Sequence, residues 1–356
     1  MKYCESLLNE LTFYVDEIKP CCSPYAYRAP QYIADFSNNI ETKKANIKKQ
    51  IEQLNLSEKQ REIIKNLNEN PENYSCSKCI FLKDEEENEI NSKNRRKYNS
   101  IFLRHWTECN ANCIHCDNHR DNTYGQKALY NPYEIIKKAY ENNLIDTQNL
   151  IVRFQGGDIG VLPEFEQFVD LFTKYGYKTI HFSTNNIVYQ PKIEAALRAG
   201  KGSLNISLDC GTRATYEKIK RTDKFNECIE NLKTYLSKGI NPSCITIHYI
   251  IIQGYNDNKN EIKAFINTMK KIGIKKVGVR IDHKDLNAYL RNEADKRVIN
   301  KYKQLITYFY NEAKKNEFSL DNDSCIEQNF VLSKKNKSDG VLKKLTTILR
   351  LFAKQK

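Results

Sequence analysis

The chain has 356 residues, and its 57 Lys and Arg against 44 Asp and Glu give a formal net charge of +13. No apolar run reaches the roughly 18 residues that a membrane-spanning helix needs, and the first residues lack the apolar core of a signal peptide, so integral membrane and secreted proteins are excluded. The 12 cysteines without a secretion signal then indicate reduced thiols and a cytoplasmic protein. No compact basic block with interleaved aromatic residues appears, so nucleic acid is not an expected partner.

Residues 1–98 form a cysteine-rich N-terminal segment and linker. An apolar alternation over Leu11–Val15 predicts a short strand, residues 41–69 have a helical period, and the acidic run Asp84–Glu89 followed by the basic run Lys93–Lys97 is typical of a linker. The thiols of this segment are Cys4, Cys21, Cys22, Cys76 and Cys79. Such a set is sufficient for an iron–sulfur cluster, and a structural zinc site with the same ligands is the alternative.

Residues 99–290 alternate short apolar runs with stretches of helical period. The runs predict strands at 101–106, 150–155, 178–183, 203–208, 244–252 and 276–281. The stretches predict helices at 132–142, 163–174, 191–199, 216–236 and 259–272. Repetition of strand and helix in this order predicts an α/β fold with a parallel sheet. Its extent fits a partial (β/α)6 barrel of the TIM type, in which the loops after the strands meet at one rim.

Several of the predicted strands are polar on one face. Arg153 alternates with Val152 and Phe154, and polar and apolar residues alternate in the same way from Leu204 to Asp209. Polar side chains inside a barrel are costly unless they meet a polar ligand or one another, so the pattern predicts a polar pocket. The alternative is that these faces point outward into water.

A dense group of thiols follows the first of these strands. Cys109, Cys113 and Cys116 have the spacing C-x3-C-x2-C, and thiolates at this density in a reducing compartment are typical of zinc or iron–sulfur sites. A four-iron cluster held by three cysteines keeps one iron open for another ligand. Pairing Cys113 and Cys116 with Cys76 and Cys79 in a four-thiolate zinc site is the alternative, but it leaves Cys109 without a role.

Small and polar residues stand at the ends of the next predicted strands. In chain order these motifs are Gln155-Gly156-Gly157-Asp158, Ser183-Thr184-Asn185-Asn186, Ser207-Leu208-Asp209 and Gly254-Tyr255-Asn256-Asp257. The glycine pair permits close approach of another backbone. Lys218 and Arg221 follow Asp209 in the next predicted helix.

The cysteine spacing and the order of these motifs resemble the radical S-adenosylmethionine (radical SAM) superfamily over about residues 99–285. The resemblance implies a [4Fe-4S] cluster on Cys109, Cys113 and Cys116 whose open iron binds the amino and carboxylate groups of SAM. It also implies reductive cleavage of SAM to a 5′-deoxyadenosyl radical, which abstracts hydrogen from a substrate.

The resemblance further implies a set of SAM-binding residues. These are His115, Gly156, Gly157, Asp158, Asn185, Ser207, Asp209, Lys218, Arg221 and Asn256. Asp158 stands where the family more often has Glu. His115 precedes the third cysteine, where the family favours an aromatic residue near the adenine, and a packing or solvent-facing histidine is the alternative. No residue is assigned to the hydrogen abstraction itself.

The N-terminal thiols resemble SPASM or twitch modules, which bind auxiliary [4Fe-4S] clusters but usually follow the barrel. This resemblance implies a radical SAM enzyme that modifies a peptide or protein, supplied with electrons by a donor such as flavodoxin or ferredoxin. A radical SAM enzyme acting on a sugar or another small metabolite is the alternative, and a non-catalytic zinc or iron–sulfur binding module is a third.

Residues 291–356 form a predicted C-terminal helical extension. From Val341 onward apolar residues recur at helical spacing with basic residues largely opposite, which predicts a basic amphipathic helix. Such a helix docks on its own domain or contacts an anionic membrane surface or a partner.

Overall fold

The computed structural model describes residues 2–3, 9–15, 18–19, 83–84, 97–120, 122–290 and 293–321. The chain divides into a first unit, 1–108 with 124–181, and a second unit, 109–123 with 182–356. The basic tail from Val341 and the N-terminal thiols lie outside the described residues, these thiols being Cys4, Cys21, Cys22, Cys76 and Cys79. The domain boundaries placed after residues 98 and 290 therefore stay predictions.

Short parallel strands form the sheet of the first unit. They are β2 (Glu10–Phe13), β5 (Ser100–Leu103) and β6 (Ile151–Phe154), with β3 (Ile18–Lys19) antiparallel to β2. A separate pair joins β1 (Lys2–Tyr3) to β4 (Lys83–Asp84). The helical elements are α6 (Pro132–Glu141), the 3₁₀ turn η4 (Ile159–Val161) and α7 (Phe165–Tyr175). The strand predicted over Leu11–Val15 is confirmed as β2, which begins one residue earlier and ends two residues earlier than predicted.

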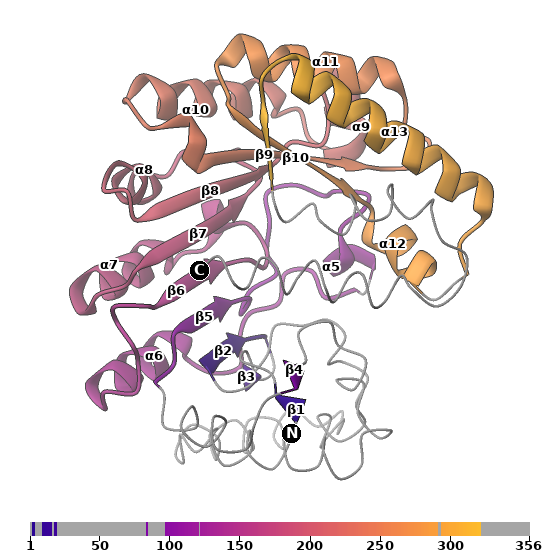
Figure 1. Ribbon diagram of the computed structural model, residues 1–356. Helices are drawn as coiled ribbons and strands as arrows, with labels where there is room; N and C mark the ends of the chain where they lie inside the picture. The colour runs from indigo at the N-terminus through magenta and orange to yellow at the C-terminus, as the bar shows by residue number, and fades with distance from the viewer. Residues whose placement is uncertain are drawn as a thin grey trace. The chain divides into compact units, whose positions relative to one another are not determined.

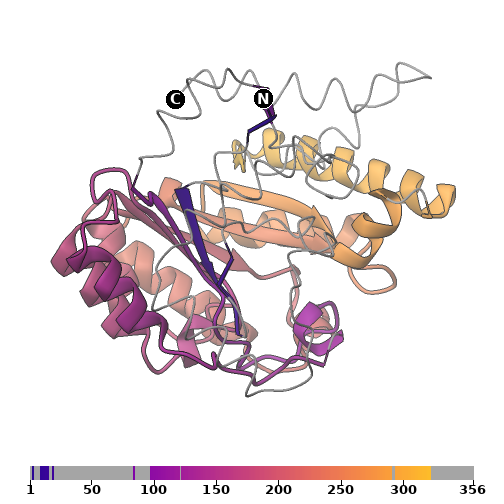
Figure 2. The ribbon, with the colours of Figure 1, turned by 90° about the horizontal axis from the view of Figure 1, so that it is seen from below.

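The helices α6 and α7 lie together on one side of the first unit's strands (Figures 1 and 2). Helix α6 starts at Pro132 because the Asn131 side chain accepts a hydrogen bond from the Glu134 amide at 3.2 Å. Phe154 points from β6 into α7, and its ring centroid lies 5.3 Å from that of Phe165. The other face of β6 is polar, since Arg153 donates to the Ser100 hydroxyl at 3.0 Å.

The second unit is also strand and helix in alternation. Its strands β8 (Gly202–Ser207), β9 (Ile245–Ile251), β10 (Lys276–Ile281) and β11 (Ser319–Leu320) are parallel. Its helices are α5 (Asp117–Arg120), α8 (Pro191–Arg198), α9 (Arg213–Lys220), α10 (Phe225–Ser237), α11 (Lys259–Ile272), α12 (His283–Leu290) and α13 (Lys296–Lys315), with the 3₁₀ turn η5 at Pro242–Cys244.

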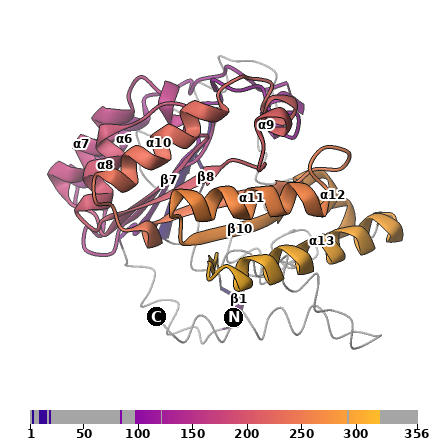
Figure 3. The same ribbon diagram turned by 90° about the horizontal axis from the view of Figure 1, so that it is seen from above.

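Helices α11 and α13 lie alongside each other against β9 and β10 (Figure 3). Tyr249 of β9 packs its ring 5.1 Å from that of Phe265, which in turn lies 5.9 Å from Phe309 of α13. All three side chains are fully buried, so the predicted C-terminal extension begins with a helix that belongs to the core of this unit.

Strand β7 (Thr179–Thr184) has residues in both units. The hydrogen-bonded strand order is β11-β10-β9-β8-β7-β6-β5-β2-β3, which confirms the α/β fold with a partial parallel barrel of the TIM type. One predicted helix was wrong, because the stretch 216–236 is two helices. Arg221 takes the left-handed conformation (φ 53°) and ends α9, and α10 starts at Phe225. None of the helices in the described ranges is long and apolar enough to cross a membrane.

His105, which follows β5, has a ring that is buried among aromatic side chains of the first unit, and this burial can be tested. Its ring lies 5.0 Å from Trp106 and 5.2 Å from Phe168, and burial lowers the pKa of His105 to about 4. The unfolded chain binds this proton more readily, so the free energy of unfolding falls as the pH drops from about 6.5 towards 4. We predict that His105→Phe, which keeps the ring, flattens this dependence by at most about 3 kcal/mol. Urea unfolding across that pH range checks it, and an unchanged slope would contradict it.

Candidate functional site

The loop that carries the three clustered cysteines lies in the second unit. Cys109, Cys113 and Cys116 are partly buried, and the described residues contain no disulfide at them. The amides on either side of Cys113 are hydrogen-bonded to the C-terminal end of α9, Asn112 N–H to the Lys220 carbonyl and Ile114 N–H to the Ile219 carbonyl, both at 3.0 Å. Helix carbonyls at this end have no partner within the helix, so α9 has acceptors to offer the loop.

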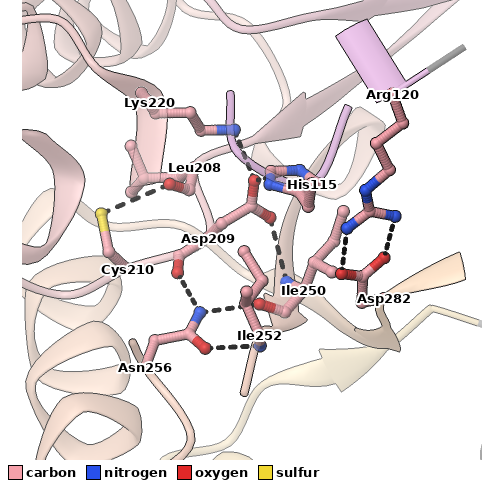
Figure 4. Close-up of polar contacts among 10 residues, drawn as sticks. All are labelled: His115, Arg120, Leu208, Asp209, Cys210, Lys220, Ile250, Ile252, Asn256 and Asp282. Atoms are coloured by element: carbon pink, nitrogen blue, oxygen red, sulfur yellow. Dashed lines mark hydrogen bonds and ion pairs between the residues drawn. The ribbon is translucent and has the colours of Figure 1, made fainter. Parts of the chain in front are cut away.

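A second attachment holds α5, which directly follows Cys116. The Arg120 guanidinium makes a two-pronged ion pair with Asp282 after β10, with Nη1–Oδ1 at 2.8 Å (Figure 4). Next to it, His283 Nδ1 lies 2.9 Å from Asp117 Oδ2. These contacts were not predicted from the sequence, because the partners are more than 160 residues apart and belong to no motif.

Asn185, predicted as a cofactor ligand, lies against the first cysteine. Its side-chain amide donates to Asn110 Oδ1 at 2.6 Å and lies 3.5 Å from Cys109 Sγ, while its Oδ1 accepts from the Ile187 amide at 2.9 Å. The loop is therefore attached at α9, at the end of β10 and at the end of β7.

Asp209 and Lys220 form a fully buried ion pair beside this loop (Figure 4). Burial by itself raises the pKa of Asp209, but Lys220 and His115 lower it more, and the carboxyl stays ionised. Burial likewise lowers the pKa of Lys220, and the charges of Asp209 and Cys113 raise it more strongly. Asp209 takes a left-handed backbone conformation (φ 64°), which Asp tolerates better than most residues, and its Oδ1 accepts from the Ile250 amide at 3.0 Å.

His115 completes this group. Its Nε2 lies 3.6 Å from Asp209 Oδ2. Burial lowers the pKa of His115 to about 4, so the ring is neutral near pH 7 and this contact is not an ion pair there. Within the described part of the chain, His115 Nδ1 is buried and has no hydrogen-bond partner. A buried ring nitrogen of this kind is costly unless a ligand meets it.

Other predicted residues divide into buried and exposed positions. Asn256 is fully buried and ties two strand ends together, since its amide donates to the Asp209 carbonyl at 2.6 Å and its Oδ1 accepts from the Ile252 amide at 2.7 Å (Figure 4). Ser207 is half-buried at the end of β8. Lys218 and Arg221 are exposed, whereas Lys220, which the motif analysis did not select, is the basic residue of α9 that reaches the site.

The glycine pair of the first unit supports the segment that leads into the cysteine loop. A Cβ at Gly157 would lie 1.8 Å from the Glu108 carbonyl oxygen, and one at Gly156 would lie 2.5 Å from that of Trp106. The neighbouring amides bond to the same segment, Gly157 N–H to Trp106 O and Asp158 N–H to Glu108 O, both at 2.9 Å. Asp158 Oδ1 also accepts from the Gly160 amide at 2.8 Å and so caps η4.

The donor set of the loop fits an iron–sulfur cluster, because thiolates are the usual ligands of such clusters. Within the described residues, no group of three His, Cys, Asp or Glu side chains is placed to hold a single metal ion. A [4Fe-4S] cluster distributes its thiolate ligands over different irons, so Cys109, Cys113 and Cys116 need not converge on one point. The zinc alternative with Cys76 and Cys79 lies outside the described residues.

The close packing at Gly157 yields a prediction. In Gly157→Ala the added methyl group meets backbone atoms of Glu108, which cannot rotate away, so the segment before Cys109 must shift. We expect a loss of about 1–3 kcal/mol in the free energy of unfolding, together with less iron bound per chain after anaerobic reconstitution. Gly202→Ala, whose new methyl group meets nothing closer than 3.2 Å, is the control. Equal losses in the two variants would contradict the prediction.

Comparison with known proteins gives relatives over part of the chain. GTP 3′,8-cyclase of Clostridium botulinum (strain Hall) is 27% identical over 195 residues, which are 51% of this chain and 56% of that protein. GTP 3′,8-cyclase of Petrotoga mobilis is 30% identical over 168 residues, 45% of this chain and 48% of that protein. The chain thus spans about half the length of these curated relatives.

A solved structure is similar in fold. Streptococcus suis SuiB bound to precursor peptide SuiA has a TM-score of 0.51 at 12% identity, covering 88% of this chain and 70% of that chain. At this identity the likeness concerns the fold alone.

The family model of the radical SAM superfamily matches residues 103–269. This stretch runs from the last residue of β5 into α11 and contains Cys109, Cys113 and Cys116 together with each strand-end motif identified from the sequence. Over this stretch, which is slightly less than half of the chain, the protein is similar to the radical SAM superfamily.

Proposed function

We propose that Cys109, Cys113 and Cys116 hold the family's [4Fe-4S] cluster and that the enzyme cleaves SAM reductively at this loop. When bound, the cluster supplies the electron that splits SAM into methionine and a 5′-deoxyadenosyl radical. The observation that carries the proposal is the attachment of this loop by hydrogen bonds and an ion pair to α9, Asn185 and Asp282. Such attachment fixes the thiols before any metal is bound, which favours cluster assembly.

The chain's own residues have distinct proposed roles toward SAM. His115 and Ser207 are the candidates for direct contact, since His115 carries a buried nitrogen without a partner among the described residues and Ser207 is half-buried at a strand end. Asp209 and Asn256 are already engaged by Lys220 and by backbone groups, which favours a role in holding the strand ends. Gly156, Gly157 and Asp158 offer backbone at the end of β6, while Lys218 and Arg221 contact SAM only if it reaches the exposed side of α9.

For the substrate we propose a small metabolite. The curated relatives are named GTP 3′,8-cyclases, which supports a small molecule, although the match covers about half of their length. The peptide or protein substrate expected from the N-terminal thiols rests on residues outside the described ranges. The first test is therefore GTP with SAM and a low-potential reductant, followed by a search for new products and, with deuterium-labelled GTP, for deuterium transferred into deoxyadenosine. Turnover of a peptide but of no nucleotide or other metabolite would contradict this choice.

Metal removal tests the proposed cluster. The reconstituted protein should show broad visible absorption, an electron paramagnetic resonance signal on reduction, and slow release of 5′-deoxyadenosine with SAM and reductant. Replacing Cys109, Cys113 and Cys116 together with Ala should abolish deoxyadenosine release. Cys244→Ala, which removes a partly buried thiol at η5, should leave it unchanged. Zinc without iron after careful anaerobic reconstitution would contradict the proposal.

We further propose that Cys4, one of Cys21 and Cys22, Cys76 and Cys79 hold an auxiliary [4Fe-4S] cluster that binds substrate or carries an electron. Full loading should then approach about eight irons per chain, and the triple Ala variant should retain about four. Iron and zinc analysis of both proteins checks this. A triple variant that keeps its fold by circular dichroism but binds only zinc would indicate a structural zinc site instead.

A further inference from the structure

Lys220 is a buried cation whose role the proposed function leaves open. The side chain of Lys220 is 2% exposed, and its ammonium donates to Asp209, which is also inaccessible to solvent. Burying such a pair costs desolvation energy, and apolar residues of similar volume often serve folding as well or better. Stability alone therefore does not explain this ion pair, and its location next to the cysteine loop suggests a role there.

The geometry brings Lys220 to the cysteine loop in two ways. Its carbonyl accepts the Asn112 amide at 3.0 Å, and the carbonyl of Ile219 accepts the Ile114 amide, so Cys113 lies between two residues attached to the end of α9. The ammonium also lies at this loop, because its partner Asp209 Oδ2 is 3.6 Å from Nε2 of His115, a residue between Cys113 and Cys116 (Figure 4). The buried pair therefore lies against the loop that carries Cys113.

We infer that Lys220 is a positioning residue for the cluster-binding loop: it fixes the backbone around Cys113 and presents a buried positive charge, anchored by Asp209, to the thiolate there. The inference rests on the proposed cluster. Net charge and hydrogen bonding around the sulfurs set the reduction potential of such a cluster, and reduction adds a negative charge. A cation held in a dry environment next to one thiolate favours the reduced form, which is the form that SAM cleavage requires.

The test compares the reduction potentials of the reconstituted wild type and of Lys220→Met. Each potential is measured in a redox titration that is monitored by the electron paramagnetic resonance signal of the reduced cluster. Met keeps the volume and removes the charge. We expect the equilibrium constant for reduction to fall about tenfold, a shift of about 59 mV to more negative potential for one electron. Lys220→Arg keeps the charge and should restore most of the wild-type value. Lys233→Met removes an exposed lysine paired with Glu230 on α10 and should change nothing.

Lys220→Met leaves the buried carboxylate of Asp209 without its partner, and this variant can therefore fail to fold. A second variant keeps the test valid in that case. Lys220→Met combined with Asp209→Asn removes both charges, and Asn tolerates the left-handed backbone at this position while keeping an acceptor for the Ile250 amide. Its potential should also be more negative than that of the wild type. A wild-type potential in a folded, iron-loaded Lys220→Met or double variant would overturn the inference alone. A wild type that holds no reducible cluster would overturn the proposed function and this inference with it.

Discussion

The attachment of the cysteine loop to the C-terminal end of α9 is the constraint on which the rest of the site depends. The carbonyls of Ile219 and Lys220 accept hydrogen bonds from the amides on either side of Cys113. The positions of the thiols therefore depend on the position of α9. The buried pair of Lys220 and Asp209 fixes that end of the helix to β8, and the Ile250 amide on Asp209 extends the attachment to β9. A loop without regular structure is thereby held by two strands and a helix end.

Several residues that the sequence motifs assign to ligand binding are needed for the backbone conformation of the chain itself. Gly157 is a glycine because Glu108, the residue before Cys109, occupies the space where a Cβ would be. Asp209 has a left-handed conformation that lets its side chain receive the Ile250 amide, and Asn256 satisfies the Asp209 carbonyl from the other side. These residues shape the site whether or not they touch SAM, so a loss of activity on substituting them does not by itself identify a ligand.

The alternation of apolar runs and helical stretches was sufficient to predict the parallel α/β fold, because each strand and each helix has its own spacing of apolar residues. The cysteine spacing and the order of the strand-end motifs together were sufficient to predict the resemblance to the radical SAM superfamily. The choice of Lys218 over Lys220 missed the period of α9, because Lys220 lies four residues after Tyr216 and shares its buried face. Arg221 in the left-handed conformation ends the helix directly after Lys220. The ion pair of Arg120 with Asp282 could also not be predicted from the sequence, because no local pattern links two residues so far apart in the chain.

The central claim is that the loop of Cys109, Cys113 and Cys116 holds a cluster with one iron open to SAM. Electron paramagnetic resonance and electron–nuclear double resonance on the reduced protein test it most directly, using SAM labelled isotopically at its amino nitrogen. The account predicts a hyperfine coupling between that nitrogen and the cluster, absent from the triple Ala variant. Labelled SAM that binds the reduced protein without any such coupling would contradict it.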